Sequence, residues 1–197
     1  EILNVFKKEL FKSLSFSELK RELKESSSSN LQRGILNFKK EGLINIEQAG
    51  KTHIISLNYE NNKLFYYLSI LGLEFNKNIP FEILYKIQQE ILKETEFFSL
   101  IVFGSYAEDK QTAKSDLDVA VIIENQELKN KIVSRIASVK RKMLKEIHGQ
   151  IFTRNEFLEM LRNEEENVGK EIARKHFVFY GLINFYKLIL KGAKWKD

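Results

Sequence analysis

Two short polar motifs, each joined to an apolar run, constrain this chain more than any other feature. The motif Gly-Ser-Tyr-Ala at residues 104–107 directly follows the apolar residues 100–103, and the motif Ser-Asp-Leu-Asp at residues 115–118 directly precedes the apolar residues 119–123. This order predicts a strand, a tight turn, a short helix, a loop and a second strand. We therefore expect the two motifs to lie beside each other at one end of a sheet.

The residue types in these motifs indicate phosphate chemistry. Side chains alternate along a strand, so Asp116 and Asp118 are expected to project from the same face. Neighbouring carboxylates repel each other unless a cation lies between them, and Mg²⁺ prefers carboxylate oxygens and leaves coordination positions for phosphate. Gly104 lets the backbone approach a phosphate, and Ser105 offers a hydroxyl and is expected to cap a helix whose N-terminal amides favour an anion. Together these features predict phosphoryl or nucleotidyl transfer.

In this order and spacing, the two motifs resemble the signature of the DNA polymerase beta-like nucleotidyltransferases. Their short form is similar to the minimal nucleotidyltransferases common in archaea and bacteria, and the resemblance covers roughly residues 95–160. It implies that Asp116 and Asp118 bind the Mg²⁺ that holds the triphosphate of ATP or another NTP, and that Gly104 and Ser105 cradle its β and γ phosphates. The implied reaction is transfer of a nucleotidyl group, favoured as adenylyl, to a hydroxyl of a protein or small molecule.

The resemblance also implies a third carboxylate on the neighbouring strand, predicted at residues 148–153. When that strand is aligned on its apolar continuation, Gln150 stands at the third position. Glutamine offers a carbonyl oxygen but neither a charge nor a base. His148 shares the strand face and is a candidate substitute base, although a strand-edge residue of no special role is the simpler reading. A site built in this way is expected to bind nucleotide and to transfer it slowly or not at all, and Glu146 is the further candidate if the alignment is wrong.

The first 58 residues predict three helices followed by a hairpin, an order that resembles a winged helix-turn-helix domain. In such domains the third helix enters the DNA major groove and the wing contacts the backbone. Ten Lys and Arg residues against seven Asp and Glu give this part a net charge of +3, which is modest for a DNA-binding domain and leaves protein docking as the alternative. The residues predicted to contact DNA are Ser28, Asn30, Gln32, Arg33, Asn37, Lys39, Lys40 and Lys51.

The predicted fold class is α+β, with an N-terminal winged helix-turn-helix and a small mixed-sheet nucleotidyltransferase domain flanked by helices. The expected boundaries are residues 1–58 for the first domain, 59–78 for a helical linker and 79–192 for the second domain. Within the second domain, the residue pattern predicts a long basic amphipathic helix over 124–147. It also predicts a helical segment over 167–190, broken near Gly181.

Composition limits the other function classes. The chain has 197 residues and no cysteine, which excludes a disulfide framework and thiolate metal sites. Its apolar runs are too short for a membrane span and no segment resembles a signal peptide, so a cytoplasmic protein without membrane contact is expected. The net charge of +5 mildly favours a polyanionic partner.

Three hypotheses about function follow. The first is a nucleotidyltransferase coupled to a DNA-binding domain. The second is a DNA-binding regulator whose transferase domain is a weakened nucleotide sensor. The third is a non-catalytic, antitoxin-like protein with a helical protein partner, because some minimal nucleotidyltransferases are antitoxins paired with a helical toxin. Many winged-helix regulators read two half-sites, so a homodimer is compatible with the second hypothesis.

Overall fold

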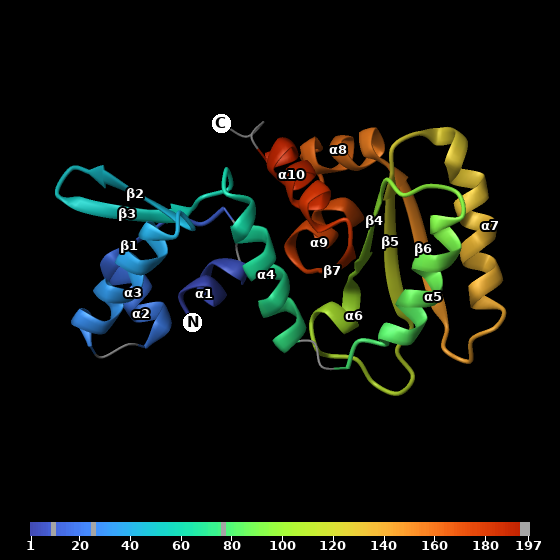
Figure 1. Ribbon diagram of the computed structural model, residues 1–197, viewed down its shortest axis with the longest axis horizontal. Helices are drawn as coiled ribbons and strands as arrows, with labels where there is room; N and C mark the ends of the chain where they lie inside the picture. Colours follow the sequence, from blue (N-terminus) through green and yellow to red (C-terminus); the bar gives the residue numbers. More distant parts are fainter. Residues whose placement is uncertain (9–10, 25–26, 76–77, 194–197) are drawn as a thin grey trace. The chain divides into compact units, whose positions relative to one another are not determined.

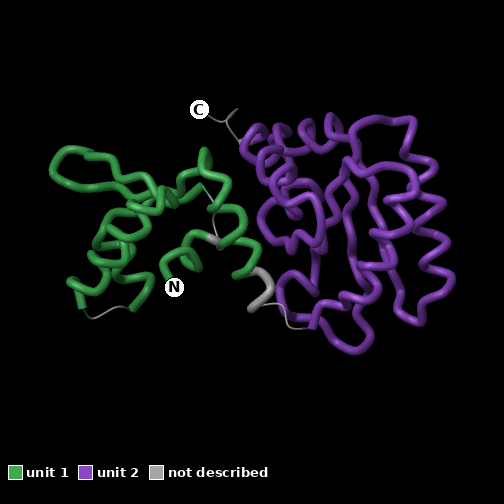
Figure 2. The backbone as a smooth tube through the Cα atoms, in the orientation of Figure 1, with its two compact units in different colours: residues 1–71 green, residues 72–197 purple. Residues whose placement is uncertain are grey.

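The computed structural model describes residues 1–8, 11–24, 27–75 and 78–193. The chain forms two compact units, residues 1–71 and residues 72–197 (Figure 2). The division falls inside the segment that was expected to join two domains, within a single helix, α4 (Asn62–Phe75). In the described part of the chain, none of the helices has both the length and the apolar character that crossing a membrane requires.

The first unit combines the helices α1, α2 and α3 with a three-stranded antiparallel sheet of strand order β1-β3-β2, in which the short strand β1 lies between α1 and α2 in the chain. Ser15 starts the second helix through a capping box with Glu18, and the Ser27 hydroxyl accepts a hydrogen bond from the N–H of Asn30 at the start of the third. Its elements are α1 (Ile2–Lys8), β1 (Leu14–Ser15), α2 (Phe16–Leu23), α3 (Ser28–Lys40), β2 (Ile44–Ala49), β3 (Thr52–Leu57) and α4.

The second unit is built on a four-stranded mixed sheet with the order β6-β5-β4-β7, in which only the β5–β6 pair is parallel. This confirms an α+β unit with a small mixed sheet and flanking helices. Its elements are α5 (Phe81–Leu92), β4 (Phe98–Val102), α6 (Gly104–Ala107), β5 (Leu117–Ile123), the 3₁₀ turn η1 (Gln126–Leu128), α7 (Lys129–Lys140), β6 (Ile147–Thr153), α8 (Arg154–Arg162), α9 (Val168–Arg174), β7 (Phe177–Tyr180) and α10 (Leu182–Ala193).

The two faces of this sheet carry different helices. The odd-numbered residues of β5, from Leu117 to Ile123, pack into one buried core with Ile91 of α5 and Ile136 of α7. Helices α8, α9 and α10 lie on the other side of the sheet (Figure 1). The even-numbered residues of β5, among them Asp118, therefore belong to the face that lies away from α5 and α7.

Two expected helices are shorter than the residue pattern indicated. The helix expected over 124–147 exists only as α7, because the chain turns after Lys140 and enters β6 at Ile147. The helical segment expected over 167–190 is interrupted by strand β7, which pairs with β4. The chain does break at Gly181, whose φ is +72°, and a Cβ there would lie only 2.2 Å from the carbonyl oxygen of Phe98.

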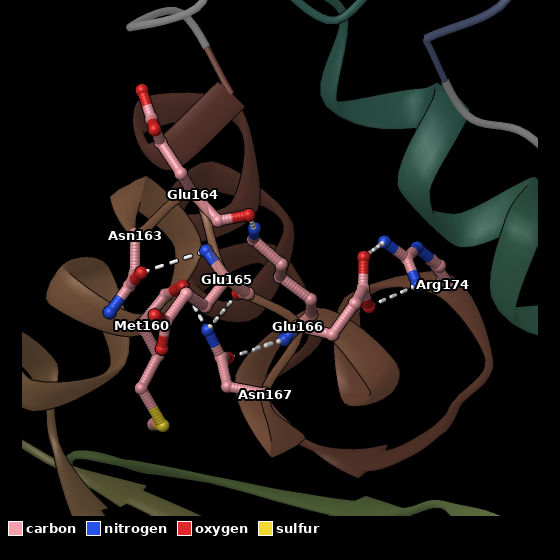
Figure 3. A network of polar contacts seen from close by, with 8 residues as sticks. Met160, Asn163, Glu164, Glu165, Glu166, Asn167 and Arg174 are labelled. Atoms are coloured by element: carbon pink, nitrogen blue, oxygen red, sulfur yellow. Dashed lines mark hydrogen bonds and ion pairs between the residues drawn. The ribbon is translucent and has the colours of Figure 1, made fainter.

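A polar network fixes the connection between α8 and α9 (Figure 3). The Asn167 side-chain amide donates to the carbonyl oxygen of Met160 at 2.8 Å, and its Oδ1 accepts from the N–H of Lys170 at 3.2 Å. The buried ammonium of Lys170 donates to the Glu164 carbonyl oxygen at 2.9 Å. Because buried polar groups need such partners, this network holds the segment that leads into β7 in one conformation.

Candidate functional site

The two motifs meet at the end of the sheet where β4 ends and β5 begins. The N–H of Phe103 donates to the carbonyl oxygen of Asp118 at 3.1 Å, so the chain is still paired with β5 as it enters the turn at Gly104. Asp118 lies in β5, whereas Asp116 directly precedes the strand rather than belonging to it. The expected convergence of the motifs is present, with one aspartate on the strand and the other in the loop that leads to it.

The backbone of Gly104 lies close to the Asp118 side chain. Gly104 has a φ of +64°, which L side chains rarely adopt, and a Cβ built there would lie 2.5 Å from Oδ2 of Asp118. Only a glycine satisfies both conditions. The backbone of the first motif therefore lies directly against a carboxylate of the second, as required if one bound group is to touch both.

The expected role of Ser105 as a helix cap is wrong. Phe103 occupies the cap position of α6 and makes no side-chain capping bond, and Ser105 lies inside this helix of four residues. The half-buried Ser105 remains next to Gly104, and its carbonyl oxygen accepts from the N–H of Lys110 at 2.9 Å. Since α6 is a single turn, its aligned peptide dipoles contribute less than those of a full helix would.

His148 joins the two aspartates from the neighbouring strand. The parallel register pairs His148 with Asp118. Its Nδ1 lies 3.7 Å from Oδ2 of Asp116 and 3.6 Å from Oδ1 of Asp118, while Nε2 lies 3.4 Å from Oε1 of Glu146. The imidazole is therefore bracketed by carboxylates on both of its nitrogens.

Gln150, which the alignment placed at the third position, lies deeper along the sheet. It pairs with Ala120, and none of the described contacts joins it to either aspartate. Of the two residues named for this position, His148 is the one that the structure brings to Asp116 and Asp118. Glu146, kept only as a further candidate, lies beside His148 at the entrance of β6.

The electrostatics of the pair favour a cation. Burial raises the pKa of the Asp118 carboxyl, the neighbouring Asp116 charge raises it further, and His148 opposes both effects. A raised carboxyl pKa means that the ionised form is less stable than it would be in water. A positive charge close to both carboxylates would restore that stability.

The two carboxylates fit a cation whose remaining coordination positions are filled by water and by substrate oxygens. Among the described residues, no group of three or more His, Asp and Glu side chains is arranged to hold a metal ion by itself. Mg²⁺ does not need such a cage, because it keeps several waters and binds through one or two carboxylates together with phosphate oxygens. Asp116 and Asp118, with the backbone of Gly104 beside them, offer these conditions.

Helix α3 presents the side chains that were expected to contact DNA. Residues Ser28, Asn30, Gln32, Arg33, Asn37, Lys39 and Lys40 all belong to α3 and are exposed, and Lys51 is exposed in the turn between β2 and β3. The same helix carries Leu36, a large apolar side chain that is 55% exposed. Leu36 borders an apolar groove between α3 and the hairpin, lined also by Phe16, Ile35, Ile46 and Ile55. The exposed surface of α3 therefore carries polar side chains next to an apolar groove.

Comparison with known proteins agrees with the geometry of the second unit. Residues 85–180 match the family described as Polymerase beta, Nucleotidyltransferase, so this part of the chain is a nucleotidyltransferase domain of that family. The matched range contains both motifs and His148. None of the curated proteins matches the chain.

One solved structure, described as a toxin–antitoxin with AMP-PNP, is similar to this chain at 14% sequence identity. The similarity covers 57% of this chain and 85% of that one, with a TM-score of 0.40. Similarity at this level supports no inference about activity or partners.

The close approach of Gly104 and Asp118 makes a stability prediction. In the wild-type protein, Gly104→Ala should lower the free energy of unfolding because an L residue there must adopt a left-handed conformation, which costs about 1–2 kcal/mol. The loss should exceed this value, because the new methyl group also collides with the Asp118 carboxylate. In an Asp118→Ala background the colliding Cγ and Oδ2 atoms are gone, and the remaining Cβ contact of 3.5 Å is ordinary. In the Asp118→Ala background, Gly104→Ala should lower the free energy of unfolding only by the cost of the left-handed conformation.

Urea unfolding of the four proteins, with hydrogen exchange in β5 as the local readout, measures this coupling. Gly50→Ala is the matched control, since Gly50 has a φ of +60° and open space around its missing side chain. Equal costs of Gly104→Ala in both backgrounds would show that the two residues are not in contact.

Proposed function

We propose that the second unit is a Mg²⁺-dependent nucleotidyltransferase that moves an adenylyl group from ATP to a hydroxyl of a protein or small molecule. The observation that carries this proposal is the contact between the Gly104 backbone and the Asp118 carboxylate in a domain of a nucleotidyltransferase family. Domains of this family generally use NTP substrates and Mg²⁺. The choice of adenylyl over another nucleotidyl group follows from the family resemblance.

Each residue has a distinct role in this proposal. Asp116 and Asp118 hold the metal, with Asp118 bound more firmly in place because it lies in the strand. Gly104 lets the backbone of the turn lie against the Asp118 carboxylate, so a phosphate held by the metal would also lie beside this turn, and the Ser105 hydroxyl donates to a phosphate oxygen. When bound, Mg²⁺ supplies charge neutralisation at the phosphate oxygens.

His148 stands where a third carboxylate would complete the site. A neutral imidazole carries no negative charge, so the site has weaker attraction for a second cation than three carboxylates would provide. Its nitrogens can accept a proton from an acceptor hydroxyl, but each lies beside carboxylate oxygens that compete for the same position. We therefore infer that nucleotide binding is retained and that transfer is slow.

The first unit is proposed to bind duplex DNA in the manner of a winged helix-turn-helix. The exposed polar side chains of α3 and of the hairpin turn support this proposal, and the modest charge of the unit limits it. The alternative is protein docking through the apolar groove beside Leu36. A DNA-binding regulator with a weakened transferase site, or an antitoxin-like partner of a helical protein, remains the alternative function of the whole chain.

The metal pair is tested by nucleotide binding. Asp116→Asn and Asp118→Asn should each abolish Mg²⁺-dependent binding of ATP in isothermal titration calorimetry, because each removes a charged oxygen ligand. Glu159→Gln, at an exposed position of α8, is the charge-matched control and should bind ATP as the wild type does. Unchanged binding by the double aspartate variant would refute the phosphate-site proposal.

The third position is tested by supplying the missing carboxylate at either residue. His148→Asp should raise the rate of labelled-ATP transfer to candidate proteins and to the chain itself, by up to about 10²–10⁴-fold if general-base help was the missing element. Gln150→Asp, two residue pairs deeper in the sheet, should leave the rate unchanged. If Gln150→Asp raises the rate and His148→Asp does not, the third position belongs to Gln150. Rapid transfer by the wild type would show that the site needs no third carboxylate.

DNA binding by the first unit is tested by gel shift of the full chain on genomic fragments. Phosphate contacts by Lys39, Lys40 and Lys51 release counterions, so affinity should fall steeply as salt rises. Arg33→Ala should reduce sequence preference more than Lys40→Ala does, because arginine reads bases and lysine mostly contacts phosphate. Absence of a complex at low salt would favour protein docking. In that case Leu36→Glu should weaken the docking, because it places a charge at the apolar groove.

A further inference from the structure

A second concave site lies on the nucleotidyltransferase sheet, at the end opposite the aspartates. Its floor is the cross-strand pair Ser99 and Ile122, and its walls come from the start of α8 and from α10. The cavity has a volume of about 310 Å³. Ile122 is four residues beyond Asp118 along β5, which corresponds to about 13 Å. The cavity is therefore separate from the catalytic site, although both lie on the same face of the sheet.

Two cations line this cavity without a counter-ion. Arg154 begins α8 and Lys187 lies on α10, and both side chains are exposed. Neither makes an ion pair or a side-chain hydrogen bond with any other residue that the structure describes. Other cations of the same unit are paired, as in Lys129 with Glu156 at 2.7 Å and Arg135 with Glu94 at 2.6 Å.

One acidic residue, Glu124, also lines the cavity, yet neither cation forms an ion pair with it in the described structure. Two unpaired positive charges against one negative charge leave the cavity with a net positive charge. A small anion is the simplest group that would satisfy both cations. The acidic side chain remains available as a hydrogen-bond acceptor for a hydroxyl or an amino group of the same ligand.

An exposed aromatic ring completes the cavity. Phe97 is 65% exposed and lines the cavity directly before β4. Its backbone is held by a hydrogen bond from its N–H to Oγ1 of Thr95 at 3.0 Å, so the ring projects from an ordered turn. Nearby on α10, the exposed amide of Asn184 provides both a donor and an acceptor.

We propose that this cavity binds a nucleotide unit, with the base stacked on Phe97, the phosphate between Arg154 and Lys187, and the base edge or ribose bonded by Asn184 or Glu124. An exposed ring beside a basic groove is the arrangement by which proteins hold unpaired bases. The ligand is a nucleoside phosphate, either free or as one unit of a single strand. The site does not depend on Asp116, Asp118 or a metal, so it stands apart from the proposed transfer reaction.

The test uses the full chain in EDTA, which removes metal-dependent binding at the aspartates. AMP and a ten-nucleotide oligodeoxyadenylate are the probes, and affinity is measured by calorimetry or fluorescence anisotropy. Both Phe97→Ala and Lys187→Ala should weaken binding by about tenfold or more, the size expected for the loss of one stacked base or one phosphate contact. Both positions are exposed, and unchanged circular dichroism spectra will show that the variants are folded.

Lys191→Ala, one turn further along α10 and also exposed, is the matched control and should bind as the wild type does. Asp118→Asn should likewise leave binding in EDTA unchanged, which separates this proposal from the transferase proposal. Tighter binding of the oligonucleotide would identify a single strand as the ligand, and equal affinity would identify a free nucleotide. If neither probe binds, or if Phe97→Ala and Lys187→Ala bind as the wild type does, the proposal is overturned.

Discussion

The candidate site depends on the contact between a backbone and a carboxylate. Gly104 brings the turn after β4 so close to Asp118 that a side chain at this position would overlap the carboxylate oxygen. The hydrogen bond from Phe103 to Asp118 extends the β4–β5 ladder into the turn and sets this distance. The geometry of the site is therefore a consequence of antiparallel pairing between two mostly apolar strands, whose burial stabilises the sheet and the site together.

The parts of the fold that local residue patterns specify could be predicted. The strand–turn–helix–strand order around Gly104 and Asp118 is set by apolar runs and by one glycine, and it is present in the structure. The strand β7 was missed because four apolar residues between helical patterns do not distinguish strand from helix. Its pairing with β4 brings the carbonyl oxygen of Phe98 within 2.2 Å of a Cβ at Gly181, a contact between residues far apart in the chain.

The third residue of the site is a matter of register, which a residue pattern does not determine. His148 and Gln150 share one face of β6, and both fit the periodicity of a strand. Their positions relative to Asp118 depend on how β6 aligns with β5 after an intervening helix, and the observed register pairs His148 with Asp118. An imidazole there adds no negative charge beside Asp116 and Asp118, whereas a carboxylate in the same place would add to the repulsion between the aspartates.

The alternation along β5 also explains why the candidate site and the cavity beside Ile122 lie on one face of the sheet. Its odd-numbered residues pack into the core with α5 and α7, and its even-numbered residues therefore lie on the opposite face. Asp118 occupies one end of that face and Ile122 the other, where α8 and α10 leave the cavity lined by Arg154 and Lys187. Ala120, between the two ends, is fully buried, so a polar side chain at this position would have no contact with water. An apolar residue therefore separates the candidate site from the cavity.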